Sequence, residues 1–247
     1  MNVKDKSFLV TGGNSGIGKS VVKLLLQQGA KVFALDVKTD QLEILKNDNA
    51  GKLQYLNADL TDFSNYNALF ETAKGSGYLF DGMVHCAGIS PLMKIEDNDI
   101  ETMLLTYRIN VLSFIELLKY FHKSEYTNDG ASVATMTSIA TSVASYRQTV
   151  YSSSKAALEQ VVRCAAKEFM DRKIRINAVS AGAVETEMLV KLEKESEGLR
   201  EKFLKYYPLG LIAPEEIANT LIYLLSDESK HMDGTILRLD SGFFVNK

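Results

Sequence analysis

The chain has 247 residues, of which 46% are hydrophobic and 24% are charged. Those values are ordinary for a globular protein and exclude a disordered chain, a collagen and a coiled coil. With 28 basic and 31 acidic residues the net charge is −3, which disfavours nucleic acid as the main partner.

Short β-rich runs alternate with longer helical runs along the chain. Strands are predicted at Ser7–Val10, Lys31–Asp36, Leu53–Asn57, Gly82–Cys86, Ser132–Ser138, Ile174–Val179 and Thr235–Leu239. Helices are predicted at Ile17–Gln28, Thr39–Lys46, Asp62–Lys74, Asp97–Lys123, Thr149–Met170 and Pro214–Leu225. The alternation predicts an α/β fold, a single-domain Rossmann-like doubly wound parallel β-sheet with helices on both faces.

The first predicted strand runs into a glycine-rich turn, Thr11–Ser20, that opens the first helix. Backbone N–H groups in such a turn can approach a phosphate at the helix N-terminus. Two motifs overlap here. Gly13–Ser20 fits the P-loop pattern G-x-x-x-x-G-K-[ST], whereas Gly12, Gly16 and Gly18 fit T-G-x-x-x-G-x-G.

The residue that ends the second predicted strand helps to distinguish between these two interpretations of the turn. Asp36 follows Gly18 by 18 residues, which is where a dinucleotide site has an acid for the adenosine ribose hydroxyls. A P-loop NTPase also needs an Asp at a strand end, but that interpretation leaves the residues described next without a role. We therefore predict dinucleotide binding and keep a P-loop NTPase as a distant alternative.

A Tyr and a Lys lie one turn apart at the start of the helix that follows the fifth strand. Tyr151 comes 13 residues after Ser138, and Tyr151 and Lys155 share one helix face with Leu158, so Lys155 points inward. Free Tyr has a pKa of about 10, and a nearby cation lowers it towards the range of a general acid and base. A buried Lys together with a positively charged nicotinamide ring could lower it to about 7. Ser138 would add a hydrogen bond to the substrate oxygen.

These features resemble the classical short-chain dehydrogenase/reductase family, and the resemblance covers nearly the whole chain. The motifs that carry it are Thr11–Gly18, Asp59–Leu60, His85–Gly88, Asn110 within Arg108–Val111, the set Ser138, Tyr151 and Lys155, Asn177–Gly182, and Thr186. Three departures from the family pattern occur. His85 and Cys86 stand in place of Asn-Asn and are interpreted as structural, Ala181 replaces a Pro, and Ser241 replaces a Gly.

The resemblance implies roles for these residues. The implied catalytic residues are Asn110, Ser138, Tyr151 and Lys155, with Asn110 holding a backbone carbonyl and a water in a proton relay. The implied cofactor-binding residues are Gly12, Asn14, Ser15, Gly16, Ile17, Gly18, Asp36, Asp59, Leu60, Ala87, Gly88, Tyr151, Lys155, Val184 and Thr186. We place one domain at 1–247, with the cofactor-binding half at about 1–90 and the catalytic and substrate half at about 91–247.

The charge-rich segment at about 185–207 interrupts the pattern, and we interpret it as a helical flap over a site, with a solvated surface helix as the alternative. The substrate wall is expected from Ile89–Ile95, Ile139–Gln148 and Val184–Tyr207. Arg147 could meet an anionic substrate, although an exposed arginine is the simpler interpretation.

The predicted function is the interconversion of a secondary alcohol and a ketone with a nicotinamide cofactor. The alternative is a 3-oxoacyl-thioester (acyl carrier protein) reductase that uses NADP. We predict NAD over NADP because the Asp36 carboxylate would repel a 2′-phosphate, and because neither Ser15 nor Val37 is cationic. Lys38 is the complication, since it lies close enough to reach a phosphate.

The remaining expectations concern metals, location and assembly. Cys86 and Cys164 share no metal or disulfide spacing, so we expect no metal. No apolar run is long enough for a signal peptide or a membrane span, so we expect a cytoplasmic protein without membrane partners. Two long helices carry apolar residues on more than one face, which with the resemblance implies a homotetramer or homodimer. Those residues are Val111, Phe114, Ile115, Leu118, Val161, Val162, Cys164 and Phe169.

Overall fold

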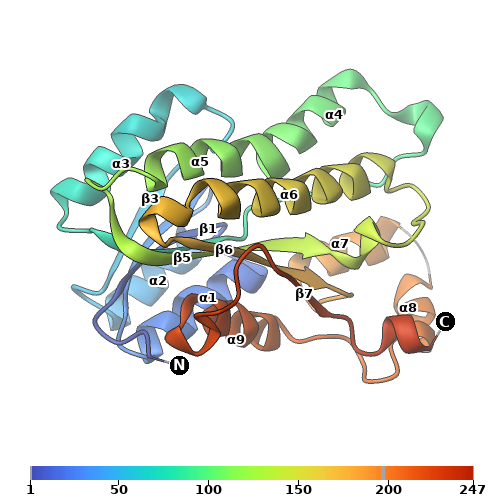
Figure 1. Cartoon of the computed structure of the whole chain (residues 1–247). Helices are drawn as coiled ribbons and strands as arrows, with labels where there is room; N and C mark the ends of the chain where they lie inside the picture. Colours follow the sequence, from blue (N-terminus) through green and yellow to red (C-terminus); the bar gives the residue numbers. More distant parts are fainter. Residues whose placement is uncertain (1, 196–197, 247) are drawn as a thin grey trace.

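Seven parallel strands form one sheet at the centre of the molecule, in the order β3-β2-β1-β4-β5-β6-β7 (Figure 1). The computed structural model describes residues 2–195 and 198–246. The strands are β1 (Ser7–Thr11), β2 (Lys31–Asp36), β3 (Leu53–Asn57), β4 (Phe80–His85), β5 (Thr127–Ser138), β6 (Arg175–Ala181) and β7 (Ile236–Leu239). This arrangement confirms the predicted doubly wound parallel sheet.

Helices cover both faces of the sheet (Figure 1). One face carries α1 (Gly16–Gln27), α2 (Asp40–Asp48) and α9 (Pro214–Leu225). The other carries α3 (Tyr66–Gly75), α4 (Ile100–Tyr107), α5 (Ser113–Phe121) and α6 (Thr149–Glu168). Strand side chains alternate between the two faces, with Leu9 in one core cluster and Phe8 and Val10 in the other.

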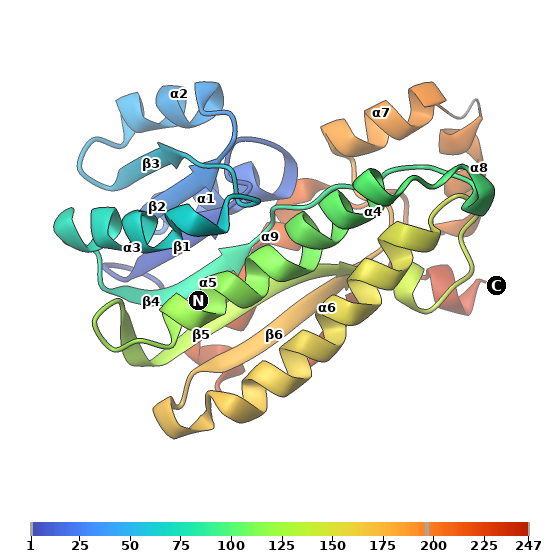
Figure 2. The ribbon, with the colours of Figure 1, turned by 90° about the horizontal axis from the view of Figure 1, so that it is seen from above.

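The strand order reverses between β1 and β4, which makes a crevice at the carboxyl ends of these strands the expected ligand site. Two short helices, α7 (Glu187–Glu195) and α8 (Leu199–Tyr206), lie at that end, in the segment for which we predict a flap (Figure 2). No helix within the described residues is long and apolar enough to cross a membrane.

The predicted long helix over Asp97–Lys123 is wrong in its detail. A 3₁₀ turn at Ile95–Asp97 precedes α4, and Asp99 caps α4 by accepting a hydrogen bond from the Thr102 amide at 2.7 Å. A π-helical segment, Arg108–Leu112, then separates α4 from α5. Hydrophobic periodicity does not reveal such a segment, because a π-helical turn is continuous with the α-helices on either side of it. Such turns occur frequently at functional sites.

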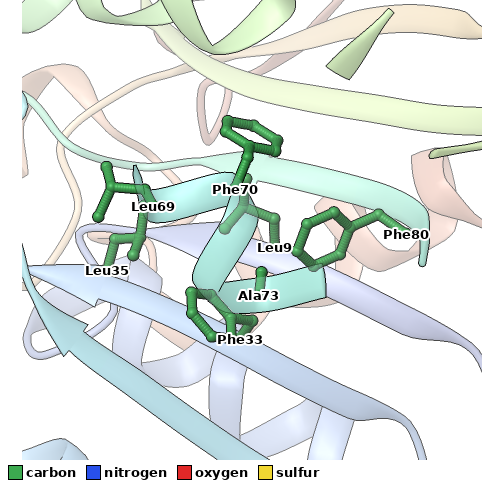
Figure 3. Close-up of a pocket in the computed structure, with 7 residues that line it drawn as sticks. All are labelled: Leu9, Phe33, Leu35, Leu69, Phe70, Ala73 and Phe80. Carbon is green, nitrogen blue, oxygen red and sulfur yellow. The ribbon is translucent and has the colours of Figure 1, made fainter. Parts of the chain in front are cut away.

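Two cavities lie away from the strand carboxyl ends. One, of about 10 Å³, lies between α3 and the sheet and is lined by Leu9, Phe33, Leu35, Leu69, Phe70, Ala73 and Phe80 (Figure 3). Its lining is wholly apolar, so it offers a water no partners. The other, of about 280 Å³, opens beside the amino ends of β1, β4, β5 and β6 and has a mixed-charge lining that includes Lys6, Asp81, Asp129 and Lys173.

Candidate functional site

The turn between β1 and α1 is built so that the backbone comes as close as possible to its neighbours. Gly12 has φ +67, and a Cβ there would lie 2.8 Å from the Ala87 amide nitrogen. A Cβ at Gly18 would lie 2.0 Å from the Gly12 carbonyl oxygen, and Gly16 opens α1 with φ +48. Only glycine fits these positions, and the resulting cradle at a helix N-terminus suits the phosphates of a dinucleotide.

Asp36 at the end of β2 faces this turn. Its carboxylate accepts hydrogen bonds from the Asn14 amide at 3.0 Å and the Lys38 amide at 3.1 Å. The Asn14 side chain points instead to α2, where its Oδ1 accepts from the Gln41 amide at 2.9 Å and its Nδ2 donates to Asp40 at 3.0 Å. The side chain of Asn14 therefore positions α2, and only its backbone faces Asp36.

The residues that follow β3 complete the same side of the site. β2 and β3 are in register at Asp36 and Asn57, so Asp59 lies just beyond the strand end. The Asp59 carboxylate is exposed and accepts from the Thr61 amide and hydroxyl, each at 2.8 Å. Leu60 is buried, and its carbonyl accepts from the Tyr66 hydroxyl at 2.8 Å.

The end of β4 is fastened to the turn through one hydroxyl group. Thr11 Oγ1 lies 2.8 Å from His85 Nδ1 and accepts from the Ala87 amide at 3.3 Å. Burial lowers the pKa of His85 to about 3 and raises the pKa of the Cys86 thiol to about 12. Both groups are therefore neutral near pH 7, which agrees with their structural interpretation.

Asn110 lies in the π-helical segment and is fully buried. Its side chain accepts from the Ile89 amide at 2.9 Å and donates to the Ile89 carbonyl at 3.0 Å, which fixes the chain just after Gly88. The same amide group donates to Ser154 Oγ at 3.0 Å, and Ser154 donates to the Tyr151 carbonyl at 2.7 Å. A hydrogen-bonded chain thus joins the π-helical segment to the first turn of α6.

Tyr151 and Lys155 stack along α6 as their spacing predicts. Lys155 is 6% exposed, its Nζ lies 5.9 Å from the Tyr151 ring centroid, and it donates to the Met136 carbonyl at 2.9 Å. Burial lowers the pKa of Lys155 to about 8. Burial raises the pKa of Tyr151, and a hydrogen bond with the Ser138 side chain opposes part of that shift.

The flap segment begins directly beside the glycine turn. A Cβ at Gly16 would lie 3.3 Å from the Thr186 methyl carbon, so Thr186 lies against the cradle. Val184 pairs with Ile212 in a short parallel bridge, which sets where the chain leaves the sheet. Arg200 of α8 forms ion pairs with Glu185 and with Glu193 of α7, at 3.2 Å for the latter, and so ties the two flap helices together.

Known proteins of similar sequence and structure share this arrangement of elements. Residues 12–244 match the family described as Enoyl-(Acyl carrier protein) reductase. The 3-oxoacyl-[acyl-carrier-protein] reductase FabG of Thermotoga maritima is 29% identical, over 99% of this chain and 100% of the relative. The crystal structure of a short chain dehydrogenase family protein from Francisella tularensis superposes with a TM-score of 0.86 at 31% identity, covering 97% and 99% of the two chains. The chain belongs to the short-chain dehydrogenase/reductase family.

As a member of the short-chain dehydrogenase/reductase family, the protein is an NAD(P)-dependent oxidoreductase that acts on small molecules. Its relatives differ in the substrates they are named for. The NAD-dependent glycerol dehydrogenase of Listeria innocua is 29% identical over 99% of this chain and 96% of the relative. The acetoacetyl-CoA reductase of Synechocystis sp. is 32% identical over 97% of each. Family membership also decides between the overlapping motifs, in favour of the dinucleotide turn over the P-loop.

Two residues of the site differ from expectation. Ser154 was not among the predicted residues, although a hydroxyl three residues after Tyr151 on the same helix face was a usable signal. Arg147 is partly buried rather than exposed, and its guanidinium donates to the Leu92 carbonyl at 2.8 Å. Within the described residues no group of three or more His, Cys, Asp or Glu could hold a metal ion.

Proposed function

We propose that the protein interconverts a secondary alcohol and a ketone, with NAD as the hydride carrier and Tyr151 as the proton donor and acceptor. The observation that carries the proposal is the stacking of Tyr151 on a buried Lys155 at the same sheet edge as the glycine cradle. The cradle offers backbone N–H groups at a helix N-terminus that suit a dinucleotide's phosphates, and a Tyr beside a buried cation suits proton exchange.

Each group has a distinct part in the proposed reaction. When bound, a nicotinamide cofactor supplies hydride chemistry at the substrate carbon that carries the oxygen. Ser138 donates a hydrogen bond to that oxygen, and the Tyr151 hydroxyl gives it a proton in reduction or accepts one in oxidation. Lys155 places a cation beside Tyr151, which favours the phenolate. Burial raises the Tyr151 pKa, and the positive charge of an oxidised nicotinamide would lower it in the oxidation direction.

Asn110 acts by holding other groups in place. Its side chain fixes both backbone groups of Ile89, and through Ser154 it is joined to the turn that carries Tyr151. The remaining predicted cofactor contacts follow from position: Asp36 and Asp59 at the ribose and adenine, the turn at the pyrophosphate, and Ala87, Gly88, Val184 and Thr186 towards the nicotinamide.

Asp36 supports NAD as the cofactor. Its carboxylate lies at the end of β2, held by the Asn14 and Lys38 amides, where a 2′-phosphate would meet a like charge. Val37, just after the strand, is exposed and apolar. We expect kcat/KM to be at least about tenfold higher with NAD than with NADP on the same substrate, because about 1.4 kcal/mol of repulsion suffices for that ratio.

The test measures both cofactors against a panel of secondary alcohols and ketones, followed at the absorbance of the reduced nicotinamide. Asp36→Ala should bring the kcat/KM values for NAD and NADP closer together, mainly by weakening the binding of NAD. A kcat/KM for NADP equal to or above that for NAD would reject the cofactor assignment.

A 3-oxoacyl-thioester reductase that uses NADP is the second candidate. It is favoured by the relatives named for 3-oxoacyl-[acyl-carrier-protein] and acetoacetyl-CoA. The same panel separates the two candidates once it includes a 3-oxoacyl thioester and a small free ketone. Turnover confined to the thioester, with NADP preferred, would replace the first candidate by the second.

A further inference from the structure

Arg147 has a backbone conformation that residues other than glycine rarely adopt. Its φ is +64, in the left-handed region, where a Cβ is disfavoured. Two contacts hold it there: the Arg147 carbonyl accepts from the Met93 amide at 2.9 Å, and Met93 pairs with Gln148 in a parallel bridge. Strained residues that their surroundings hold in this way cluster at ligand sites.

The strained backbone directs a guanidinium group onto the neighbouring loop. Its Nη2 donates to the Leu92 carbonyl at 2.8 Å, and the side chain is partly buried. A guanidinium has five N–H donors in a planar fork, so this contact leaves most of them for another acceptor.

The described part of the chain gives Arg147 no carboxylate partner. Of the acids that follow Leu92 in the loop, Glu96 lies 3.8 Å from Lys94 and Asp99 caps α4. Several other arginines are paired with acids, such as Arg172 with Asp129 at 2.7 Å and Arg238 with Asp240 at 3.3 Å, whereas the partly buried Arg175 donates to a set of backbone carbonyls. The donors of the Arg147 guanidinium that Leu92 does not engage are thus available to an anionic ligand.

Arg147 belongs to the loop before α6 and contacts the loop after β4, and these two loops flank the candidate catalytic groups. It precedes Tyr151 by four residues, and Leu92 follows Ile89, which Asn110 fixes, by three. The loop before α6 and the loop after β4 run side by side at the carboxyl end of the sheet, as their bridge requires (Figure 2). The guanidinium therefore lies on the loop that leads into the turn carrying Tyr151, against the loop that follows Ile89.

We propose that Arg147 anchors an oxyanion of the substrate, so that the protein acts on a small ketone or alcohol bearing a carboxylate or phosphate group. The inference rests on the proposed oxidoreductase function and adds the substrate class to it. The guanidinium fork matches such groups in a bidentate manner, and its contact with Leu92 orients it for that pairing.

The test uses matched pairs of compounds, in which one member carries an anionic group and the other carries a neutral group at the same position. The first series is oxo acids with one to four carbons between ketone and carboxylate, each beside its primary amide. The second arm is dihydroxyacetone phosphate beside dihydroxyacetone, which distinguishes phosphate from carboxylate. Turnover is followed with reduced nicotinamide, and binding is followed separately by thermal stabilisation in the presence of oxidised cofactor.

The variants are Arg147→Gly, which suits a positive φ and removes the guanidinium, and Lys94→Ala, which removes a nearby exposed cation. We expect wild type and Lys94→Ala to favour the anionic member of at least one pair by about 10- to 100-fold in kcat/KM. Arg147→Gly should lose that preference and keep its activity on the neutral member.

The two readouts fail separately. If no anionic member stabilises the wild type more than its neutral partner, or if Arg147→Gly keeps the preference, the anchor assignment is wrong whatever the turnover shows. If the anionic members bind through Arg147 and no compound in either series or in the wider alcohol and ketone panel is turned over, the oxidoreductase function is rejected and the anion site stands.

Discussion

His85 shows how a single buried residue can tie the site to the stability of the whole chain. The Ala87 amide donates to Thr11 Oγ1, and the same oxygen lies within hydrogen-bond distance of His85 Nδ1, at 2.8 Å. Nε2 is buried and has no hydrogen-bond partner within the described residues. A protonated ring would hold its positive charge away from water, and this loss of solvation lowers the His85 pKa to about 3.

This pKa predicts a loss of stability in acid. Because the folded-state pKa of His85 lies below the unfolded value of about 6.5, the unfolded chain binds this proton more readily between those two values, and stability falls as pH falls. Between pH 7.5 and 4.5 the free energy of unfolding should fall by roughly 2–3 kcal/mol through His85 alone.

Urea unfolding of the wild type and His85→Asn at the two pH values measures the difference, with His231→Asn, an exposed histidine, as the control. His85→Asn should lose roughly 2–3 kcal/mol less of its free energy of unfolding than the wild type on acidification. Equal losses in the two proteins would refute the assignment of acid sensitivity to His85.

At the scale of elements, the sequence was sufficient for the presence and order of the strands but not for all of their bounds, since β4 spans Phe80–His85 rather than the predicted Gly82–Cys86. β2, β3 and α9 have the predicted bounds, because alternating or continuous apolar runs are stopped there by Asp36, Asn57 and Ser226. β5 begins five residues earlier than predicted, at Thr127, where the register against β4 shifts between Phe80 and Gly82. Such a bulge depends on pairing between strands, which a single segment does not encode.

The parts of the candidate site that could not be predicted are those made by contacts between elements. Tyr151 and Lys155 have a local spacing on one helix, so their proximity could be inferred, and Ser138 was placed near them as the residue that ends the preceding strand. The fastening of Asn110 to Ser154 joins residues 44 positions apart and depends on the π-helical segment. The helical periodicity of residues 97–123 gave no indication of the π-helical segment or of the contact between Asn110 and Ser154.

The Ser154 contact predicts a specific effect of removing one hydroxyl. Ser154→Ala should cost about 1–2 kcal/mol of stability, because the Asn110 amide loses a buried partner. It should also lower kcat with little change in cofactor affinity, because the turn that carries Tyr151 is held less firmly. Ser153→Ala is the matched control, since Ser153 is exposed and makes the same kind of bond, to the Val150 carbonyl at 3.0 Å. Equal kcat values in the two variants would show that Ser154 is only structural.

At the scale of the molecule, an apolar strip along α4, the π-helical segment and α5 suggests self-association. The sequence predicted that apolar residues on more than one face of these helices and of α6 would make subunit contacts. Most of them lie instead in the core, including Val111, Phe114, Leu118, Val162 and Phe169. Ile115 is exposed as predicted, together with residues that were not foreseen. The exposed side chains are Ile100, Leu104, Leu105, Leu112 and Ile115, with exposed fractions of 58%, 50%, 44%, 43% and 38%.

A homodimer or homotetramer that buries this strip would remove those side chains from water. Light scattering at micromolar concentration should therefore give two or four times the 27.4 kDa chain mass. Replacing Leu104 and Leu112 by Lys should lower the mass to that of a smaller assembly, whereas Ile44→Lys, an exposed apolar position on α2, should leave it unchanged. A monomeric wild type would contradict the prediction.

The most direct test of the proposed function is the turnover of Tyr151→Phe on whichever substrate the panel identifies, beside its affinity for the reduced cofactor measured by nicotinamide fluorescence. Phe keeps the ring against Lys155 and removes the proton, so kcat should fall by about 10²–10⁴ while the cofactor dissociation constant stays within about twofold. Lys155→Ala should lose both activity and cofactor affinity. Tyr151→Phe that retains most of the wild-type turnover would contradict the account.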